Sequence, residues 1–240
     1  MKEQLQHQHI AICACTSRSF IDKDKIVIIA SMLRANGYDV TIESDLCQLF
    51  SVNSSRLSEI ISGTILACYP RAVRSLSNWR GLEAVRTADI RNQTEKEILS
   101  LFDLAPDQEV VNTEKEQIWR EIEALPTTES DAWFPVIDKT RCTECGKCYD
   151  FCLFGVYGIT NKRTTVIHPQ NCKNNCPACA RVCPARAIVF PKYDKSPING
   201  GSKDDEPFNS QEMDTMYRER LRYKLQQRRA GVPLTREEIL

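Results

Sequence analysis

The chain has 240 residues, enough for one large or two modest domains, and it carries 32 Lys and Arg against 32 Asp and Glu. A formal charge of zero gives no overall basic field, so nucleic acid is not expected as a partner. The longest apolar stretch, 26–33, is far shorter than the ~18 residues of a membrane span, and the polar residues 1–9 lack the apolar core of a secretion signal. We therefore expect a cytoplasmic protein with no membrane span, whose twelve cysteines stay reduced and bind metal in preference to forming disulfides.

Strand and helix patterns alternate over about the first 100 residues. The predicted strands are 9–15, 38–42 and 63–68, and residues 83–90 are expected to return to the sheet. The predicted helices are 22–36, 56–62 with Ser54 or Ser55 as its cap, and 70–79. This order predicts an α/β domain with a small parallel sheet, βαβαβα.

Residues 92–130 are rich in Glu, Lys, Gln and Thr, and their amphipathic segment 114–125 predicts a helical connector outside a core. Two short strands, 156–160 and 164–168, are expected farther along. The final helix, 210–229, has a narrow apolar stripe among basic residues, which favours a tail packed on its own protein or on a partner over one bound to a membrane or nucleic acid. The predicted domains are 1–104, the connector 105–132, 133–193, and the linker and helical tail 194–240.

Eight cysteines form two compact runs. The first is Cys142-x2-Cys145-x2-Cys148-x3-Cys152, and the second is Cys172-x3-Cys176-x2-Cys179-x3-Cys183 followed by Pro184. Runs of four cysteines at such spacing are typical of [4Fe–4S] clusters, whereas structural zinc usually takes two separated pairs. The spacing therefore predicts two [4Fe–4S] clusters.

These runs resemble those of the two-cluster bacterial ferredoxins, which implies an α+β, ferredoxin-like dicluster domain. In that family the last cysteine of each run ligates the other cluster. The resemblance implies one cluster held by Cys142, Cys145, Cys148 and Cys183, and another held by Cys172, Cys176, Cys179 and Cys152. The chain departs from the family pattern in two places: the second run opens with three intervening residues, and Leu153 stands where the first run would end in Pro.

The other four cysteines follow the ends of predicted strands. Cys13 and Cys15 end the first strand, Cys47 follows the second and Cys68 ends the third. Since ligands bind at the carboxyl ends of strands in open α/β sheets, we expect these thiols at one edge of the sheet, where they can hold a cluster or a zinc ion. Two alternatives stay open: buried core cysteines, or a redox dithiol at Cys13 and Cys15.

The order of these features also resembles the amino-terminal domain of the heterodisulfide reductase A subunit family. There a C-x-C element, a later Cys and an Ala-Cys-x-Pro-Arg element recur in the order seen here for 13–15, Cys47 and 67–71. The stretch 81–91 is similar to a Gly-Leu…Ala-Asn-Ile-Arg element of that family. The resemblance covers about the first 100 residues, and it implies an electron-transfer complex with a third cluster at Cys13, Cys15, Cys47 and Cys68.

No Gly-x-Gly-x-x-Gly element follows a predicted strand, so we expect no flavin or nicotinamide site and no catalytic residue. The expected function is the passage of single electrons to or from a redox partner, a flavoprotein or another oxidoreductase subunit. Two alternatives stay open: an enzyme that reduces a disulfide or small molecule through the amino-terminal cysteines, and a redox-sensing or interaction protein. The sequence also leaves the assembly open between a complex subunit and a homodimer.

Overall fold

The computed structural model describes residues 9–82, 86–127, 131–201 and 210–229. The chain divides between Asp131 and Ala132 into two compact units, Met1–Asp131 and Ala132–Leu240. The predicted domain limits at 104, 132 and 193 stay a prediction.

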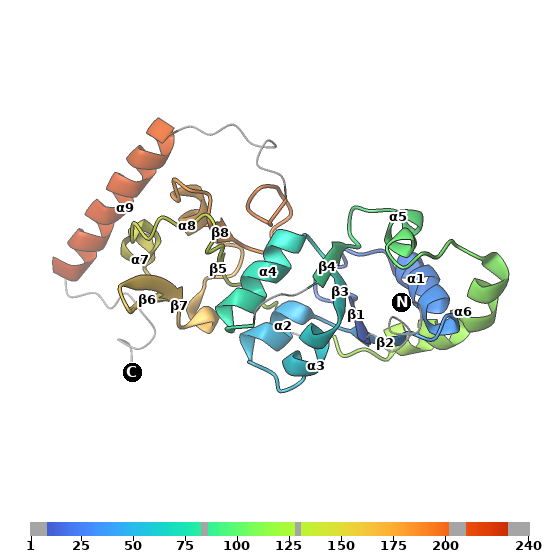
Figure 1. Ribbon diagram of the computed structural model, residues 1–240. Helices are drawn as coiled ribbons and strands as arrows, with labels where there is room; N and C mark the ends of the chain where they lie inside the picture. The colour runs from blue at the N-terminus through green and yellow to red at the C-terminus, as the bar shows by residue number, and fades with distance from the viewer. Residues whose placement is uncertain (1–8, 83–85, 128–130, 202–209, 230–240) are drawn as a thin grey trace. The chain divides into compact units, whose positions relative to one another are not determined.

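The first unit is built on a four-stranded parallel sheet with the strand order β2-β1-β3-β4 (Figure 1). The strands are β1 (His9–Cys13), β2 (Asp39–Glu43), β3 (Thr64–Ala67) and β4 (Arg86–Asp89). Every residue of β1 is buried, as expected of a parallel strand covered on both faces. At Gly63, just before β3, a Cβ atom would lie 1.8 Å from the carbonyl oxygen of His9, so glycine is needed where β3 begins beside β1.

Helices cover both faces of this sheet (Figure 1). On one side lie α1 (Lys23–Ala35), α5 (Glu95–Ser100) and α6 (Gln108–Glu123), and on the other lie α3 (Leu57–Ser62) and α4 (Pro70–Trp79). A further short helix, α2 (Leu46–Ser51), contacts α4. The predicted parallel sheet flanked by helices is therefore confirmed.

Some predicted elements differ in detail. The structure starts β2 at Asp39 and ends β3 at Ala67, and it adds α2 and α5, which the sequence pattern did not predict. The predicted serine cap is wrong: α3 is preceded by Arg56, which makes no side-chain cap, and the Ser54 hydroxyl instead accepts the N–H of Arg56 at 3.3 Å.

The predicted amphipathic segment 114–125 belongs to α6, which begins earlier because Asp107 caps it. The Asp107 carboxylate accepts the N–H of Glu109 at 2.9 Å, close to the positive end of the helix dipole. The helix packs along α1 and buries Val111, Ile118 and Ile122. The sequence pattern favoured a connector, whereas the structure shows a helix that contributes to the core of the first unit.

Within residues 132–201, the order β-α-β occurs twice, once for each cysteine run. The first set is β5 (Val136–Ile137), α7 (Lys147–Phe151) and β6 (Tyr157–Thr160). The second is β7 (Arg163–Val166), the short 3-10 helix η1 (Pro169–Asn171), α8 (Ala178–Arg181) and β8 (Ile188–Val189). The antiparallel pairs are β5 with β8 and β6 with β7, so the first and last strands of this region are joined.

The predicted tail helix is present as α9 (Ser210–Arg229), and it contacts α7 (Figure 1). The ring of Tyr217 stacks on Phe151 with the centroids 6.3 Å apart, and the Lys147 Nζ lies 5.2 Å from the Tyr217 centroid. The helix therefore packs on its own unit. None of the helices in the described parts of the chain is long and apolar enough to cross a membrane.

Candidate metal centres

The loops that carry the two cysteine runs share a backbone pattern. The residue before the second cysteine of each run has a positive φ, 56° at Glu144 and 58° at Asn175. The third residue after each run also has a positive φ, 66° at Gly155 and 48° at Arg186. The two loops therefore turn at matching positions, although the second run contains one extra residue.

Hydrogen bonds to Asp138 fix the start of the first loop. Its buried carboxylate accepts the N–H and the hydroxyl of Thr140 through Oδ1, at 3.0 and 2.6 Å. Its carbonyl oxygen accepts the N–H of Cys142 at 3.0 Å, and its own N–H donates to the carbonyl of Ala187 at 2.8 Å. Asp138 thus links the start of the first run to the residues that follow the second run.

The first group of thiols contains one cysteine from the second run. Its members are Cys142, Cys145, Cys148 and Cys183. Burial raises the pKa of Cys148 to about 12, and the nearby thiols of Cys183, Cys142 and Cys145 add to the rise. Burial also raises the pKa of Cys142, to which Cys183 contributes again, so Cys183 lies close to the first run. Cys148 and Cys183 are buried, whereas Cys145 is exposed to solvent.

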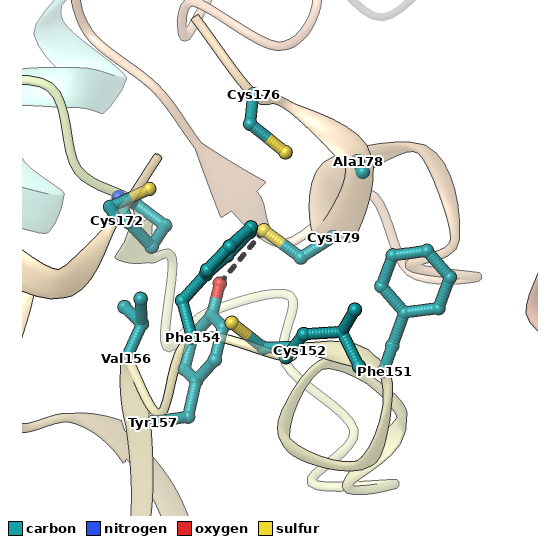
Figure 2. A pocket seen from close by; sticks show the side chains of 11 residues that line it. Phe151, Cys152, Phe154, Val156, Tyr157, Cys172, Cys176, Ala178 and Cys179 are labelled. Carbon is teal, nitrogen blue, oxygen red and sulfur yellow. Dashed lines mark hydrogen bonds between the residues drawn. The ribbon is translucent and has the colours of Figure 1, made fainter. Parts of the chain in front are cut away.

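The second group of thiols lines one cavity (Figure 2). Its members are Cys152 from the first run and Cys172, Cys176 and Cys179 from the second. Figure 2 shows the sulfur atoms of Cys152, Cys176 and Cys179 pointing toward a common space. Burial raises the pKa of Cys172 to about 12, with smaller contributions from the thiols of Cys152 and Cys176. The rest of the wall is largely apolar and includes Phe151, Leu153, Phe154, Val156 and Ala178.

A buried tyrosine contacts this second group. The hydroxyl of Tyr157 donates a hydrogen bond to Cys179 Sγ, 3.1 Å away (Figure 2). Burial raises the pKa of Tyr157 well above its usual range, so this hydroxyl keeps its proton and acts as the donor. Burial also raises the pKa of the Cys179 thiol, and the bond from Tyr157 opposes that rise.

The chemistry of both groups fits an iron–sulfur centre. Each offers four sulfur donors, the soft ligands that such clusters use. The raised pKa values of Cys148 and Cys172 mean that these thiols hold their protons until a positively charged centre displaces them. In the described residues, no three His, Cys, Asp or Glu side chains are grouped so as to hold a single metal ion.

The four amino-terminal cysteines lie at the edge of the sheet that the sequence predicted. Cys13 is the last residue of β1, and Cys15 follows it with a φ of 50°. Cys47 lies in the first turn of α2, after β2, and Cys68 directly follows β3. Because β2, β1 and β3 are adjacent and parallel, their carboxyl ends meet at this edge. Cys13, Cys15 and Cys47 are buried, and Cys68 is half-buried.

Backbone hydrogen bonds join the loops that carry these cysteines. The N–H groups of Ala14 and Thr16 donate to the carbonyl oxygens of Glu43 and Ser44, at 2.8 and 2.9 Å. The loop around Cys15 is thereby held beside the turn that leads into α2 and Cys47.

Spacing alone did not identify two residues that shape the centres, Asp138 and Tyr157. The Asp138-Lys139-Thr140 stretch contains a usable signal, because an Asp side chain that accepts an N–H two residues later is a common turn device. A tyrosine that reaches a thiol from a neighbouring strand carries no such local signal.

Comparison with known proteins identifies the part of the chain that contains both runs. Residues 108–188 match the family described as the 4Fe-4S dicluster domain. A protein named as an uncharacterized ferredoxin from Methanocaldococcus jannaschii is 44% identical over 61 residues, which are 25% of this chain and 42% of that protein. Ferredoxin-3 from a Nostoc species is 35% identical over 66 residues, 20% of this chain and 67% of its own length. The chain thus spans less than half of the first of these relatives.

All eight cysteines of the two runs fall inside the matched segment. The ferredoxin domain expected from their spacing is therefore confirmed. Through this 4Fe-4S dicluster domain, the chain belongs to the ferredoxin family.

Proposed function

We propose that the chain is an iron–sulfur electron-transfer protein whose second unit holds two [4Fe–4S] clusters. In this proposal the first group of thiols holds cluster I, and the second group holds cluster II. The observation that carries the proposal is that each group takes one cysteine from the opposite run, Cys183 in the first and Cys152 in the second. Ferredoxin ligation has the same crossed pattern.

The chain supplies position and electrostatics, and the redox chemistry belongs to the bound group. When bound, a [4Fe–4S] cluster takes up or releases one electron. The thiolates hold it, and side chains such as Phe154 and Val156 keep water away from the second group. The N–H of Ala187 donates toward Cys183 Sγ at 3.3 Å, which stabilises negative charge on that sulfur.

The exposed side of the first group is the proposed point of electron exchange. Cys145 is exposed, while Cys148 and Cys183 in the same group are buried. The proposed partner, a flavoprotein or another oxidoreductase subunit in the cytoplasm, would approach at this exposed ligand. Tyr217 of α9 also lies near this group: burial raises its pKa, and Asp150 and Cys145 contribute.

The amino-terminal cysteines are proposed to hold a third cluster. Their position at the carboxyl ends of three adjacent parallel strands supports this proposal, since ligands of open α/β sheets bind there. The resemblance of this region to the amino-terminal domain of heterodisulfide reductase A points to the same role, a relay or terminal acceptor within an electron-transfer complex.

Metal analysis of the full chain tests both proposals. We expect anaerobically purified protein to contain about twelve iron atoms and as much acid-labile sulfide, and EPR of the reduced protein to show [4Fe–4S] signals. The double variant Cys13→Ser/Cys68→Ser is expected to retain about eight iron atoms. About eight in both proteins would refute the third cluster only, and zinc in place of iron would refute the electron-transfer proposal as a whole.

A further inference from the structure

The hydrogen bond from Tyr157 to Cys179 joins two elements of the cysteine-rich region. Tyr157 is the first residue of β6, which follows the first run, whereas Cys179 lies in α8 within the second run. The two side chains are only 4% and 8% exposed, so water does not compete effectively for the 3.1 Å contact. A hydrogen bond is electrostatically stronger in such a setting than in water.

The other half of the region has no hydroxyl at the corresponding place. Tyr157 comes five residues after Cys152, and Ile188 comes five residues after Cys183. Both are the first residues of their strands, β6 and β8, and both are buried. The two halves match in backbone but differ here in side chain, because isoleucine cannot donate a hydrogen bond.

We propose that Tyr157 is a positioning residue that raises the reduction potential of cluster II. This inference rests on the proposed function, because it assumes that Cys179 ligates a cluster. Reduction adds negative charge, part of which resides on the ligand sulfurs, and a hydroxyl donor stabilises the more negative state. Tyr157 thus favours the reduced form of cluster II.

The test is a redox titration of the full chain, followed by EPR, on wild type and on Tyr157→Phe. Phenylalanine keeps the ring and removes only the donor. We expect the loss of the hydroxyl donor to lower the reduction potential of cluster II, with that of cluster I changed little. The variant Cys179→Ser, which alters a ligand of cluster II, identifies which EPR signal belongs to that cluster. Tyr149→Phe is the matched control. Tyr149 is 40% exposed, so removal of its hydroxyl should change the reduction potential of neither cluster.

Iron content separates the failure of this inference from that of the proposed function. Full iron content with unchanged potentials in Tyr157→Phe, or with equal shifts of both, would overturn the role of Tyr157 and leave the proposed function standing. If Tyr157→Phe loses iron, Tyr157→Ile is examined, because isoleucine occupies the corresponding place at Ile188. Loss of cluster II from both variants would also overturn the inference, since the hydroxyl would then be needed to retain the cluster. Absence of iron from the wild type would refute the proposed function itself.

Discussion

Glu43 is a buried carboxylate at the end of β2, beside the edge that carries the amino-terminal cysteines. The Arg56 guanidinium contacts it at 2.5 Å, but the Arg56 side chain is itself 55% exposed. Burial raises the pKa of Glu43, and the attraction of Arg56 only partly opposes the rise. Desolvation is therefore the larger effect on this group.

This shift predicts how the stability of the first unit depends on pH. Because the folded protein holds the Glu43 proton to a higher pH than the unfolded chain does, the free energy of unfolding should fall as pH rises from about 4.5 through the folded pKa. Glu43→Gln is expected to flatten this fall. The measurement is urea unfolding at several pH values in a Trp133→Phe background, where fluorescence reports Trp79 and Trp119 of the first unit. Glu116→Gln, a change at an exposed carboxylate, is the control, and a Glu43→Gln profile as steep as that of wild type would contradict the prediction.

Gly146 has a φ of 72° where the first loop enters α7, and a Cβ atom there would meet no neighbour within 4 Å. The effect of Gly146→Ala should therefore come from backbone strain of about 1–2 kcal/mol. We expect iron release to a chelator to become about 5- to 30-fold faster if this strain falls on the cluster-binding loop. Gly81→Ala is a closely matched control, since Gly81 has a φ of 73° and equally open surroundings in the first unit. Equal rates of iron release in the two variants would argue against a role for the turn in cluster retention.

At the scale of elements, substitutions in α6 test whether this helix is part of the core of the first unit. Ile118 is fully buried in the packing of α6, whereas Lys115 on the same helix is exposed. Ile118→Ala should lower the free energy of unfolding of the first unit by about 2–5 kcal/mol, because it leaves a cavity in the core. Lys115→Ala should change it little, and urea unfolding in the Trp133→Phe background measures both. A neutral Ile118→Ala would contradict the prediction that Ile118 packs in the core.

The long elements of the first unit could be predicted because their signals are local. The β1 sequence is apolar after His9, and α1 has Asp22 as its cap and an apolar residue every three or four positions. The six-residue helix α2 begins at a local cap, Asp45, but its other end is held by a distant side chain. Arg80 donates to the carbonyl oxygens of Phe50 and Ser51, each at 2.6 Å, and a contact 29 or 30 residues along the chain gives no local signal.

For the two thiol groups as well, the features with a local signal could be predicted and those that depend on distant contacts could not. Spacing alone predicts the eight cysteines of the runs as ligands, because the cysteines of each loop are neighbours in sequence. The two-residue strands β5 and β8 are too short to show a period, so their pairing could not be predicted. The bond from Tyr157 to Cys179 depends on how the two halves fold together, and a single sequence does not contain that distance.

At the scale of the whole molecule, crossed ligation makes a prediction that ligation within each run does not. Cys152→Ser and Cys179→Ser should alter the EPR signal and potential of the same cluster, although the two cysteines belong to different runs. Cys183→Ser and Cys145→Ser should alter those of the other cluster. If Cys152→Ser instead affects the cluster that Cys145→Ser affects, the ligands do not cross.

Crossed ligation also bears on the order in which the centres are completed during synthesis. A ribosome releases the chain from its amino terminus, so Cys142, Cys145 and Cys148 are the first cysteines of the two runs to emerge. In the proposed ligand sets, their fourth partner is Cys183, which emerges after every other cysteine. Cluster II has all of its ligands once Cys179 has emerged. Of the two centres in the second unit, the one whose ligands begin to appear first is thus the last whose set of ligands is completed.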